Sequence, residues 1–211
     1  MRRWIEALKM MMTPEKGHVT GEAPPDCTLC PRLVALRAEN ARREPDWHNG
    51  PVASFGDQQA RLLIVGLAPG RGGANRTGRP FTGDYAGDLL YASLSKLGLS
   101  RGTYKAHPED GVSLNGVMIS NAVRCLPPEN KPTAIEITSC RPFLVQRINA
   151  LPKVKALFAL GKIAHDSTVR ALGGRLAAMP FGHETHYQLE GPAGPLALVS
   201  SYHCSRYNTQ T

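Results

Sequence analysis

The fold is decided by residues 61–84, which read RLLIVGLAPGRGGANRTGRPFTGD. This stretch contains the longest continuous apolar run of the chain, Leu62 to Ala68, and a run of that length fits a buried strand. We expect the strand at 61–66. The glycine-rich and polar residues that follow are typical of a loop rather than of a continuing strand. The stretch therefore predicts a buried strand that ends in a functional loop.

The rest of the chain alternates between apolar strands and helices. We expect further strands at 116–121, 156–160 and 196–200, and helices at 32–43, 86–97 and 162–172. Another helix begins at Thr133, which forms a T-x-x-E capping box with Glu136. Strands that alternate with helices predict an α/β fold with a mainly parallel central sheet flanked by helices. The length of 211 residues is that of a single domain, and we assign residues 1–211 to it.

Composition and charge limit the cellular location and the binding partners that we expect for this protein. The formal net charge is +8, which favours a polyanionic partner without establishing one. No run of 18 apolar residues occurs, so we expect no membrane association. The opening MRRWIEALKMMM resembles an export signal only superficially, because Glu6 and Lys9 interrupt it and no cleavage site follows. We expect a cytoplasmic protein.

Four of the five cysteines form two pairs. Cys27 and Cys30 form C-x2-C, and Cys125 and Cys140 form C-x14-C. Disulfides are rare in the cytoplasm, so metal or redox chemistry is the favoured interpretation. The spacing alone leaves zinc and an iron–sulfur cluster equally open. Cys204 is explained as a free cysteine.

Polar residues follow the ends of three expected strands, at Gly66, Asn121 and Ser201. Ligands of parallel α/β sheets bind at the carboxyl ends of the strands, so we expect one shared site there. The glycine loop lacks both the P-loop and the G-x-G-x-x-G patterns. Its glycines, Gly66 and Gly70 among them, still allow a ligand to approach the backbone closely. The same loop holds two arginines, an aromatic ring and a carboxylate: Arg76, Arg79, Phe81 and Asp84. Phe81 could equally be a core residue, and Asp84 an N-cap.

Three segments together resemble the family 5 uracil-DNA glycosylases. They are GLAPGRGGANRTGRPFTGDYAGDLLY (66–91), NAVRCLPPENKPT (121–133) and HCSRYNTQT (203–211). The spacing of the four paired cysteines is similar to that of the cluster ligands in families 4 and 5. The resemblance implies an α/β/α sandwich and a [4Fe–4S] cluster held by Cys27, Cys30, Cys125 and Cys140. It also implies a monomeric, monofunctional enzyme that hydrolyses the N-glycosidic bond of uracil, and of related damaged bases, in DNA.

The resemblance assigns roles that agree with the chemistry of each side chain. A base must be flipped out of the duplex to be reached, and Phe81 can stack on it beside the backbone of Gly66, Ala68 and Gly70. The amide of Asn121 can donate to uracil O4 and accept from N3–H, the reverse of what cytosine requires. Asp84 would stabilise the cation-like sugar and orient water, and His203 would donate to uracil O2.

Further residues are expected to contact the DNA. The loop after His203, with Ser205, Arg206 and Tyr207, would enter the duplex and fill the gap left by the flipped base, and Arg206 could also bind phosphate. Arg76 and Arg79 would bind phosphates from the glycine loop. Arg124 and Lys131 are additional candidates for backbone contacts.

Two positions depart from the family 5 pattern. Cys204 replaces a proline, whose loss removes stiffness from its loop. Gly70 replaces an alanine and there resembles family 4. Both changes bear on the range of bases accepted rather than on the reaction.

Two other functions stay open at this stage. One is a cluster-containing, nucleotide-binding phosphohydrolase, which needs a metal-binding carboxylate group such as Asp84 with Asp88. The other is a DNA-binding protein that senses redox state and has no enzymatic activity.

Overall fold

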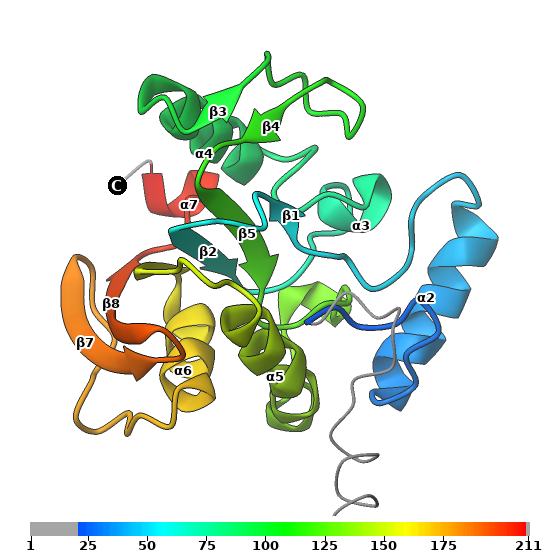
Figure 1. Ribbon diagram of the computed structural model, residues 1–211. Helices are drawn as coiled ribbons and strands as arrows, with labels where there is room; N and C mark the ends of the chain where they lie inside the picture. Colours follow the sequence, from blue (N-terminus) through cyan, green and yellow to red (C-terminus); the bar gives the residue numbers. More distant parts are fainter. Residues whose placement is uncertain (1–20, 210–211) are drawn as a thin grey trace, which may run out of the picture.

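The computed structural model describes residues 21–209, which fold around one six-stranded sheet (Figure 1). The N-terminal segment that we judged not to be an export signal lies outside the described residues. In sheet order, the strands are β1 (Phe55–Gly56), β5 (Val117–Asn121), β2 (Leu62–Gly66), β6 (Ala156–Leu160), β8 (Gly194–Ser201) and β7 (Thr185–Gly191). The helices are α2 (Pro31–Arg43), α3 (Ala74–Thr77), α4 (Tyr85–Lys96), α5 (Ala134–Asn149), α6 (Lys162–Ala171) and α7 (Arg206–Thr209).

The four central strands are parallel, as the sequence predicts. Gly66, the last residue of β2, pairs with Asn121, the last residue of β5. Leu160 at the end of β6 pairs with Ser201 at the end of β8. The polar residues that follow these strands therefore meet at one edge of the sheet, where a shared site is expected.

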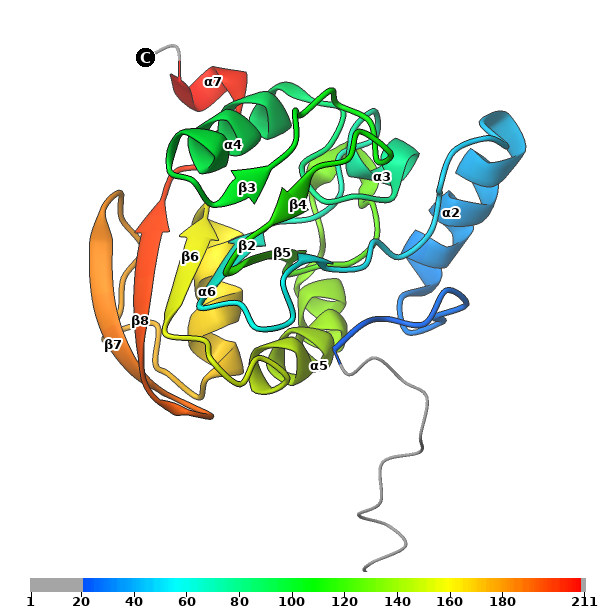
Figure 2. The ribbon, with the colours of Figure 1, turned by 45° about the horizontal axis from the view of Figure 1, so that its top comes forward.

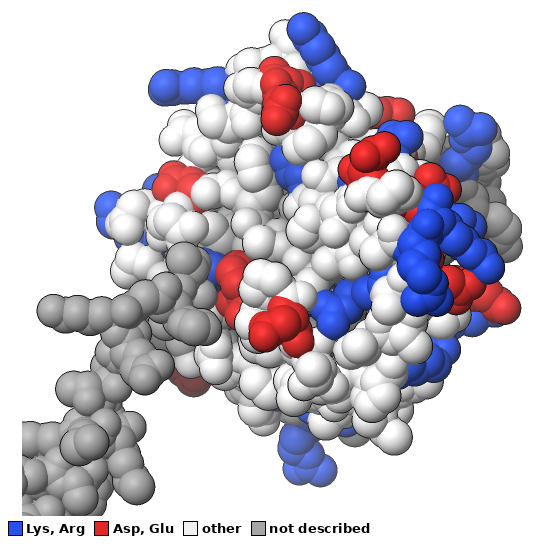
Figure 3. All heavy atoms as spheres, turned by 90° about the vertical axis from the view of Figure 1, so that its right-hand side faces the viewer, with Lys and Arg blue, Asp and Glu red and all other residues white. Residues whose placement is uncertain are grey.

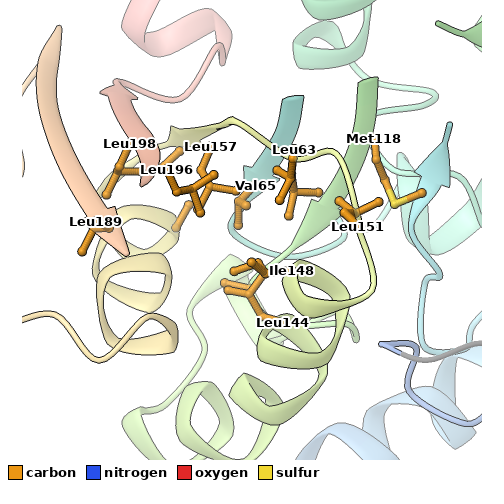
Figure 4. Close-up of a cluster of buried hydrophobic side chains, with 14 of the residues drawn as sticks. Leu63, Val65, Met118, Leu144, Ile148, Leu151, Leu157, Leu189, Leu196 and Leu198 are labelled. Carbon is orange, nitrogen blue, oxygen red and sulfur yellow. The ribbon is translucent and has the colours of Figure 1, made fainter. Parts of the chain in front are cut away.

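Successive side chains of β2 pack against helices on opposite faces of the sheet. Leu63 and Val65 lie in a core with Leu144 and Ile148 of α5, shown in Figure 4. Ile64 points the other way and belongs to a second core that contains Leu90 of α4. Figure 2 shows the resulting layers, with α4 on one side of the sheet and α5 and α6 on the other. Each fully buried leucine contributes about 1.5–3 kcal/mol to folding, so the two cores fix the sheet between its helices.

The predicted capping box is present at the start of α5. The Thr133 Oγ1 accepts from the backbone N–H of Glu136 at 3.3 Å, and the Glu136 carboxylate accepts from the Thr133 N–H at 2.7 Å. The same carboxylate accepts two hydrogen bonds from Arg32 of α2, at 2.8 and 2.7 Å. One buried glutamate therefore begins α5 and attaches α2 to it.

The observed elements differ from the expected ones mainly at the edges of the sheet. β7 and β1 are antiparallel edge strands that the sequence did not predict. The burial of β7 alternates, with Thr185, Tyr187 and Leu189 less exposed than their neighbours, but only Leu189 is fully buried, so the strand lacks the continuous apolar run of the central strands. A two-stranded sheet of β3 (Ser100–Arg101) and β4 (Ser113–Leu114) and the short 3-10 helix η1 (Pro128–Asn130) were also not foreseen. None of the helices within residues 21–209 is both long and apolar enough to cross a membrane.

Candidate functional site

A small pocket opens at the carboxyl ends of the parallel strands. It brings together residues from the glycine loop, the end of β5 and the segment after β8: Ala68, Gly70, Ala74, Phe81, Asp84, Ala86, Asn121 and His203. The candidates for catalysis and for binding of the base thus line one cavity, except Gly66, which lies directly behind it.

Gly66 allows two of these side chains to meet. A Cβ at this position would overlap Asn121 Oδ1 and would lie 2.7 Å from Phe81 Cε2. Asn121 is only 3% exposed, so its amide reaches the pocket from a fixed strand end. Any larger residue at position 66 would displace both the amide and the ring.

Phe81 holds an unusual backbone conformation. Its φ angle is 51°, in the left-handed region that aromatic residues rarely adopt. The Tyr104 hydroxyl donates to its carbonyl oxygen at 3.3 Å, and Gly87 of α4 packs directly against the same carbonyl. The buried Phe81 ring lies 5.9 Å from the imidazole of His203, with 24° between the two planes. Such strain is kept only where neighbouring groups enforce it, and here it turns the ring into the pocket.

The two carboxylate oxygens of Asp84 face different neighbours. Oδ1 accepts from the Gly87 N–H at 3.0 Å, which makes Asp84 the N-cap of α4. Oδ2 faces the glycine loop, where a Cβ on Gly73 would overlap it and one on Gly70 would lie 3.3 Å away. The capping role and the site role considered from the sequence are therefore both compatible with the structure.

His203 is half-buried beside Phe81. Burial lowers the pKa of its imidazole, and the negative charge of Asp84 opposes that shift only in part. The ring is therefore neutral near pH 7 and can donate one hydrogen bond without carrying a charge. Asn208 Nδ2 donates to the His203 carbonyl oxygen at 2.9 Å and ties the segment after β8 to α7.

Comparison with known proteins identifies the family. Residues 53–211 match the sequence model of the uracil DNA glycosylase superfamily. The chain is 47% identical over 191 residues to a type-5 uracil-DNA glycosylase of Thermus thermophilus, covering 88% of this chain and 85% of that protein. It is 38% identical to a type-5 enzyme of Pyrobaculum aerophilum (88% and 81% covered) and 35% identical to a type-4 enzyme of the same organism (74% and 72% covered).

The chain belongs to the uracil DNA glycosylase superfamily. The matches confirm the resemblance to family 5 and the partial likeness to family 4. The structure likewise confirms the fold class, an α/β domain with a mainly parallel sheet flanked by helices.

The expectation that Arg79 binds DNA phosphates is wrong, because this residue is buried. Its guanidinium donates to both carboxylate oxygens of Asp110, at 2.8 and 2.7 Å, and its Nε donates to Thr82 Oγ1 at 2.8 Å. Three aromatic rings surround it at 5.1–5.7 Å, those of Phe55, Tyr91 and Tyr104. We call this group the Arg79 cage. It holds the loop that carries Phe81 and Asp84.

The other candidates for DNA contact lie in different surroundings. Arg76 is exposed, next to Gly83. Arg206 is also exposed, with its guanidinium 5.1 Å from the centre of the Tyr85 ring, and Ser205 is half-buried. The side chain of Tyr207 lies outside the described part of the chain. Arg124 is fully buried in an ion pair with Glu22, so it is excluded as a DNA contact, whereas Lys131 is exposed.

Cys204, which replaces the family proline, is anchored to α4. Its thiol donates to the Ala86 carbonyl oxygen at 3.4 Å. This contact joins the loop after His203 to the helix that Asp84 caps. It restrains the loop by a side-chain contact, where a proline would restrain it through its ring.

The four paired cysteines come together in a different part of the molecule. Cys27, Cys30, Cys125 and Cys140 line one hollow with apolar side chains such as Leu33, Val123 and Phe143. The backbone N–H of Arg124 donates to Cys140 Sγ at 3.2 Å. Burial raises the pKa of Cys125 to about 12 and that of Cys140 to about 11. Within residues 21–209, no three His, Cys, Asp or Glu side chains converge closely enough to hold a single metal ion.

The carboxylate pair required by a phosphohydrolase does not form. Asp84 lines the pocket at the strand ends, whereas Asp88 is exposed and lines a hollow between α4 and the β3–β4 region. The residue set that sequence reasoning missed is the Arg79 cage. Its charged partner, Asp110, lies 31 residues away in the chain, and no local pattern marks it.

Proposed function

We propose that this protein hydrolyses the N-glycosidic bond of uracil in DNA and leaves an abasic site, the first step of base excision repair. The observation that carries the proposal is the meeting of Asn121, Asp84 and His203 around Phe81 in one pocket. The relatives whose names specify uracil-DNA glycosylases support the same activity. Related damaged bases are included in the proposal.

In this mechanism the flipped base lies against Phe81 and is read by Asn121. Stacking on an aromatic face contributes about 1–3 kcal/mol per base. The Asn121 amide nitrogen donates to uracil O4, and its oxygen accepts from N3–H. Cytosine presents the opposite groups at these atoms, and a mismatched buried polar group costs roughly 1–3 kcal/mol. Because Asn121 is almost fully buried, water cannot compensate for the mismatch.

Asp84 and His203 act on opposite sides of the breaking bond. The Asp84 oxygen that faces the glycine loop stabilises the positive charge that develops on the sugar and orients the attacking water. The neutral imidazole of His203 donates to uracil O2 as negative charge develops on the base. No covalent intermediate forms, so the proposed enzyme is monofunctional.

DNA binding is proposed to combine the pocket with phosphate contacts. Arg76 lies on the loop beside the pocket, while Ser205, Arg206 and Tyr207 follow His203 and would enter the space left by the flipped base. Figure 3, seen from the side of α2, shows Lys and Arg side chains grouped toward one edge of that face, with Asp and Glu among them. We propose that the enzyme acts as a monomer in the cytoplasm, where its thiols stay reduced.

The four cysteines are proposed to hold a [4Fe–4S] cluster. The hollow fits such a group, because four cysteines line a largely apolar space and a backbone N–H already donates to the sulfur of one of them. Because burial raises the pKa of Cys125 and Cys140, both are protonated thiols near neutral pH in the chain alone. A positively charged cluster would stabilise their thiolate forms. When bound, the cluster would cross-link the segment before α2 to α5 and would take no part in hydrolysis.

The test is a strand-cleavage assay with the full-length protein purified under anaerobic conditions. An oligonucleotide with one uracil should be cut at that position after alkaline treatment, whereas the matched oligonucleotide with thymine should stay intact. Borohydride should trap no enzyme–DNA adduct, because no amine attacks the sugar. The Asp84→Asn variant serves as the control for a contaminating glycosylase.

The outcomes of this assay distinguish a uracil-DNA glycosylase from a phosphohydrolase and from a redox-sensing DNA-binding protein. Release of phosphate from nucleotides without uracil excision would establish the phosphohydrolase. DNA binding that changes with the redox state of the protein, without excision, would establish the sensor. Either result would refute the proposed function.

A further inference from the structure

A second hollow lies between α5 and α6 and shares no residue with the active-site pocket. Thr138 and Arg141 line it from α5, and Asp166, Ser167 and Arg170 line it from α6. None of these residues was given a role by the sequence, by the family resemblance or by the proposed mechanism. The hollow is therefore independent of the site for uracil.

Two of the residues that line the hollow carry buried donors that lack acceptors. The Arg141 Nε and the Ser167 Oγ are buried and have no hydrogen-bond partner in the described part of the chain. Ser167 as a whole is 2% exposed. A buried donor without an acceptor costs about 1–3 kcal/mol, and more when it is charged, so these two atoms lower the stability of the α5–α6 region.

The charges of the hollow are also unbalanced. Across residues 21–209, neither Arg141 nor Arg170 forms an ion pair, although each is a full positive charge. The one carboxylate in the lining, Asp166, already accepts from Lys162 Nζ at 2.6 Å. Both arginines line the same hollow, and the pKa of Arg141 is lowered first by burial and then by the positive charge of Arg170.

We propose that this hollow is a binding site for an oxyanion of the phosphate class. An anion between Arg141 and Arg170 would remove their repulsion and would accept from both guanidinium groups. Planar guanidinium groups match the oxygen pairs of phosphate, and the hydroxyl of the exposed Thr138 offers a further donor. Inorganic phosphate and a phosphate of the DNA backbone present the same chemistry, so the experiment must separate these two sources.

The first arm measures binding of inorganic phosphate to the full-length, cluster-containing protein by titration calorimetry. Sodium chloride at equal ionic strength is the reference. Saturable phosphate binding is expected, and Arg141→Gln and Arg170→Gln should each weaken it about tenfold or more, the value of a lost charge-assisted hydrogen bond. Arg101→Gln, an exposed arginine of β3 with the same change in charge, should bind phosphate normally. Asp166→Asn should bind it more tightly, because a nearby negative charge is removed.

The second arm measures the salt dependence of binding to undamaged duplex DNA. If a backbone phosphate occupies the hollow, each arginine variant should make the negative slope of log K against log [salt] less steep by about one. If free phosphate is the ligand, the slope and the rate of uracil excision should equal those of the unaltered protein. This arm rests on the proposed function, whereas the first does not.

Three results would overturn the proposal. They are absence of phosphate binding by the unaltered protein, equal binding by Arg141→Gln and Arg170→Gln, and equal weakening by Arg101→Gln. Because Arg170 is exposed, its variant tests the site even if Arg141→Gln does not fold.

Discussion

Two regions support the functional parts of this molecule in different ways, the Arg79 cage and the cysteine hollow. In the cage, every charge is balanced by the chain itself, since Arg79 and Asp110 are both buried and bonded to each other. In the cysteine hollow, four thiols face an apolar space, and the chain offers them one backbone N–H donor. The first region is complete as a folded chain, whereas the second is the proposed site of a cluster, a group that the chain does not encode.

The sharpest way to test this difference is to remove one cysteine. Cys140→Ala should abolish iron binding and leave the protein poorly soluble, because a cross-link between distant segments is lost. Iron content and the absorbance of the thiolate-to-iron charge-transfer band measure the effect. Cys204→Ala is the matched control and should keep its iron, since Cys204 lies against α4 and not in the hollow. A soluble, active and iron-containing Cys140→Ala protein would contradict the assignment.

Removing one partner of the buried ion pair should have the next largest effect. Asp110→Ala leaves the Arg79 charge buried without a partner, which should lower the free energy of unfolding by about 3–5 kcal/mol. Urea denaturation measures it. Glu129→Ala is the control, because its ion pair with Lys131 is exposed and should contribute at most about 1 kcal/mol. Equal losses in the two variants would show that the cage is not the stronger support.

The same ion pair predicts an effect of acid. The hydrogen bonds from Arg79 hold the pKa of Asp110 well below its usual value. The pair therefore stabilises the fold fully above the ordinary aspartate pKa of about 3.9, and this contribution is lost as the pH falls below it. Asp110→Ala should remove that part of the pH dependence of unfolding.

Substitutions of Asp84 can distinguish its role as the N-cap of α4 from its proposed role in catalysis. Asparagine caps helices as well as aspartate does, so Asp84→Asn should leave the free energy of unfolding nearly unchanged. The single-turnover rate of uracil excision should nevertheless fall by about 10²–10³. Asp84→Ala should lose the same rate and about 1 kcal/mol of stability as well. A normal rate in Asp84→Asn would remove the carboxylate from the mechanism.

The smallest expected effect is a shift in the pH dependence of the rate of uracil excision. Since burial lowers the pKa of His203, the rate should stay constant from pH 8 to below the ordinary histidine value of about 6.5 and fall only at lower pH. Asp84 raises this pKa, so the residual activity of Asp84→Asn should persist to lower pH still. A midpoint above 6.5, or one that remains in His203→Ala, would assign the titration to another group.

The parts of this structure that could be predicted from the sequence are those with local signals. Buried parallel strands appear as apolar runs, and Thr133 with Glu136 marks the start of α5. The position of Asn121 and His203 at strand ends followed from the same reasoning. The prediction that Arg79 contacts DNA is wrong because an arginine in a polar loop is normally exposed. Its partner Asp110 and the aromatic rings around it come from distant segments, which no local pattern reveals. The edge strand β7 was missed because only Leu189 of it is buried.

The bond between Asp84 and Gly87 has one more consequence. Rotation of the carboxylate would break the hydrogen bond that begins α4, so the direction of the second oxygen is set when the helix forms. A side chain already fixed by folding loses no further rotational freedom when DNA arrives. The helix therefore fixes the orientation of the carboxylate that we propose to act on the sugar. A mutation that frays the first turn of α4 should then slow uracil excision without altering any residue that lines the pocket.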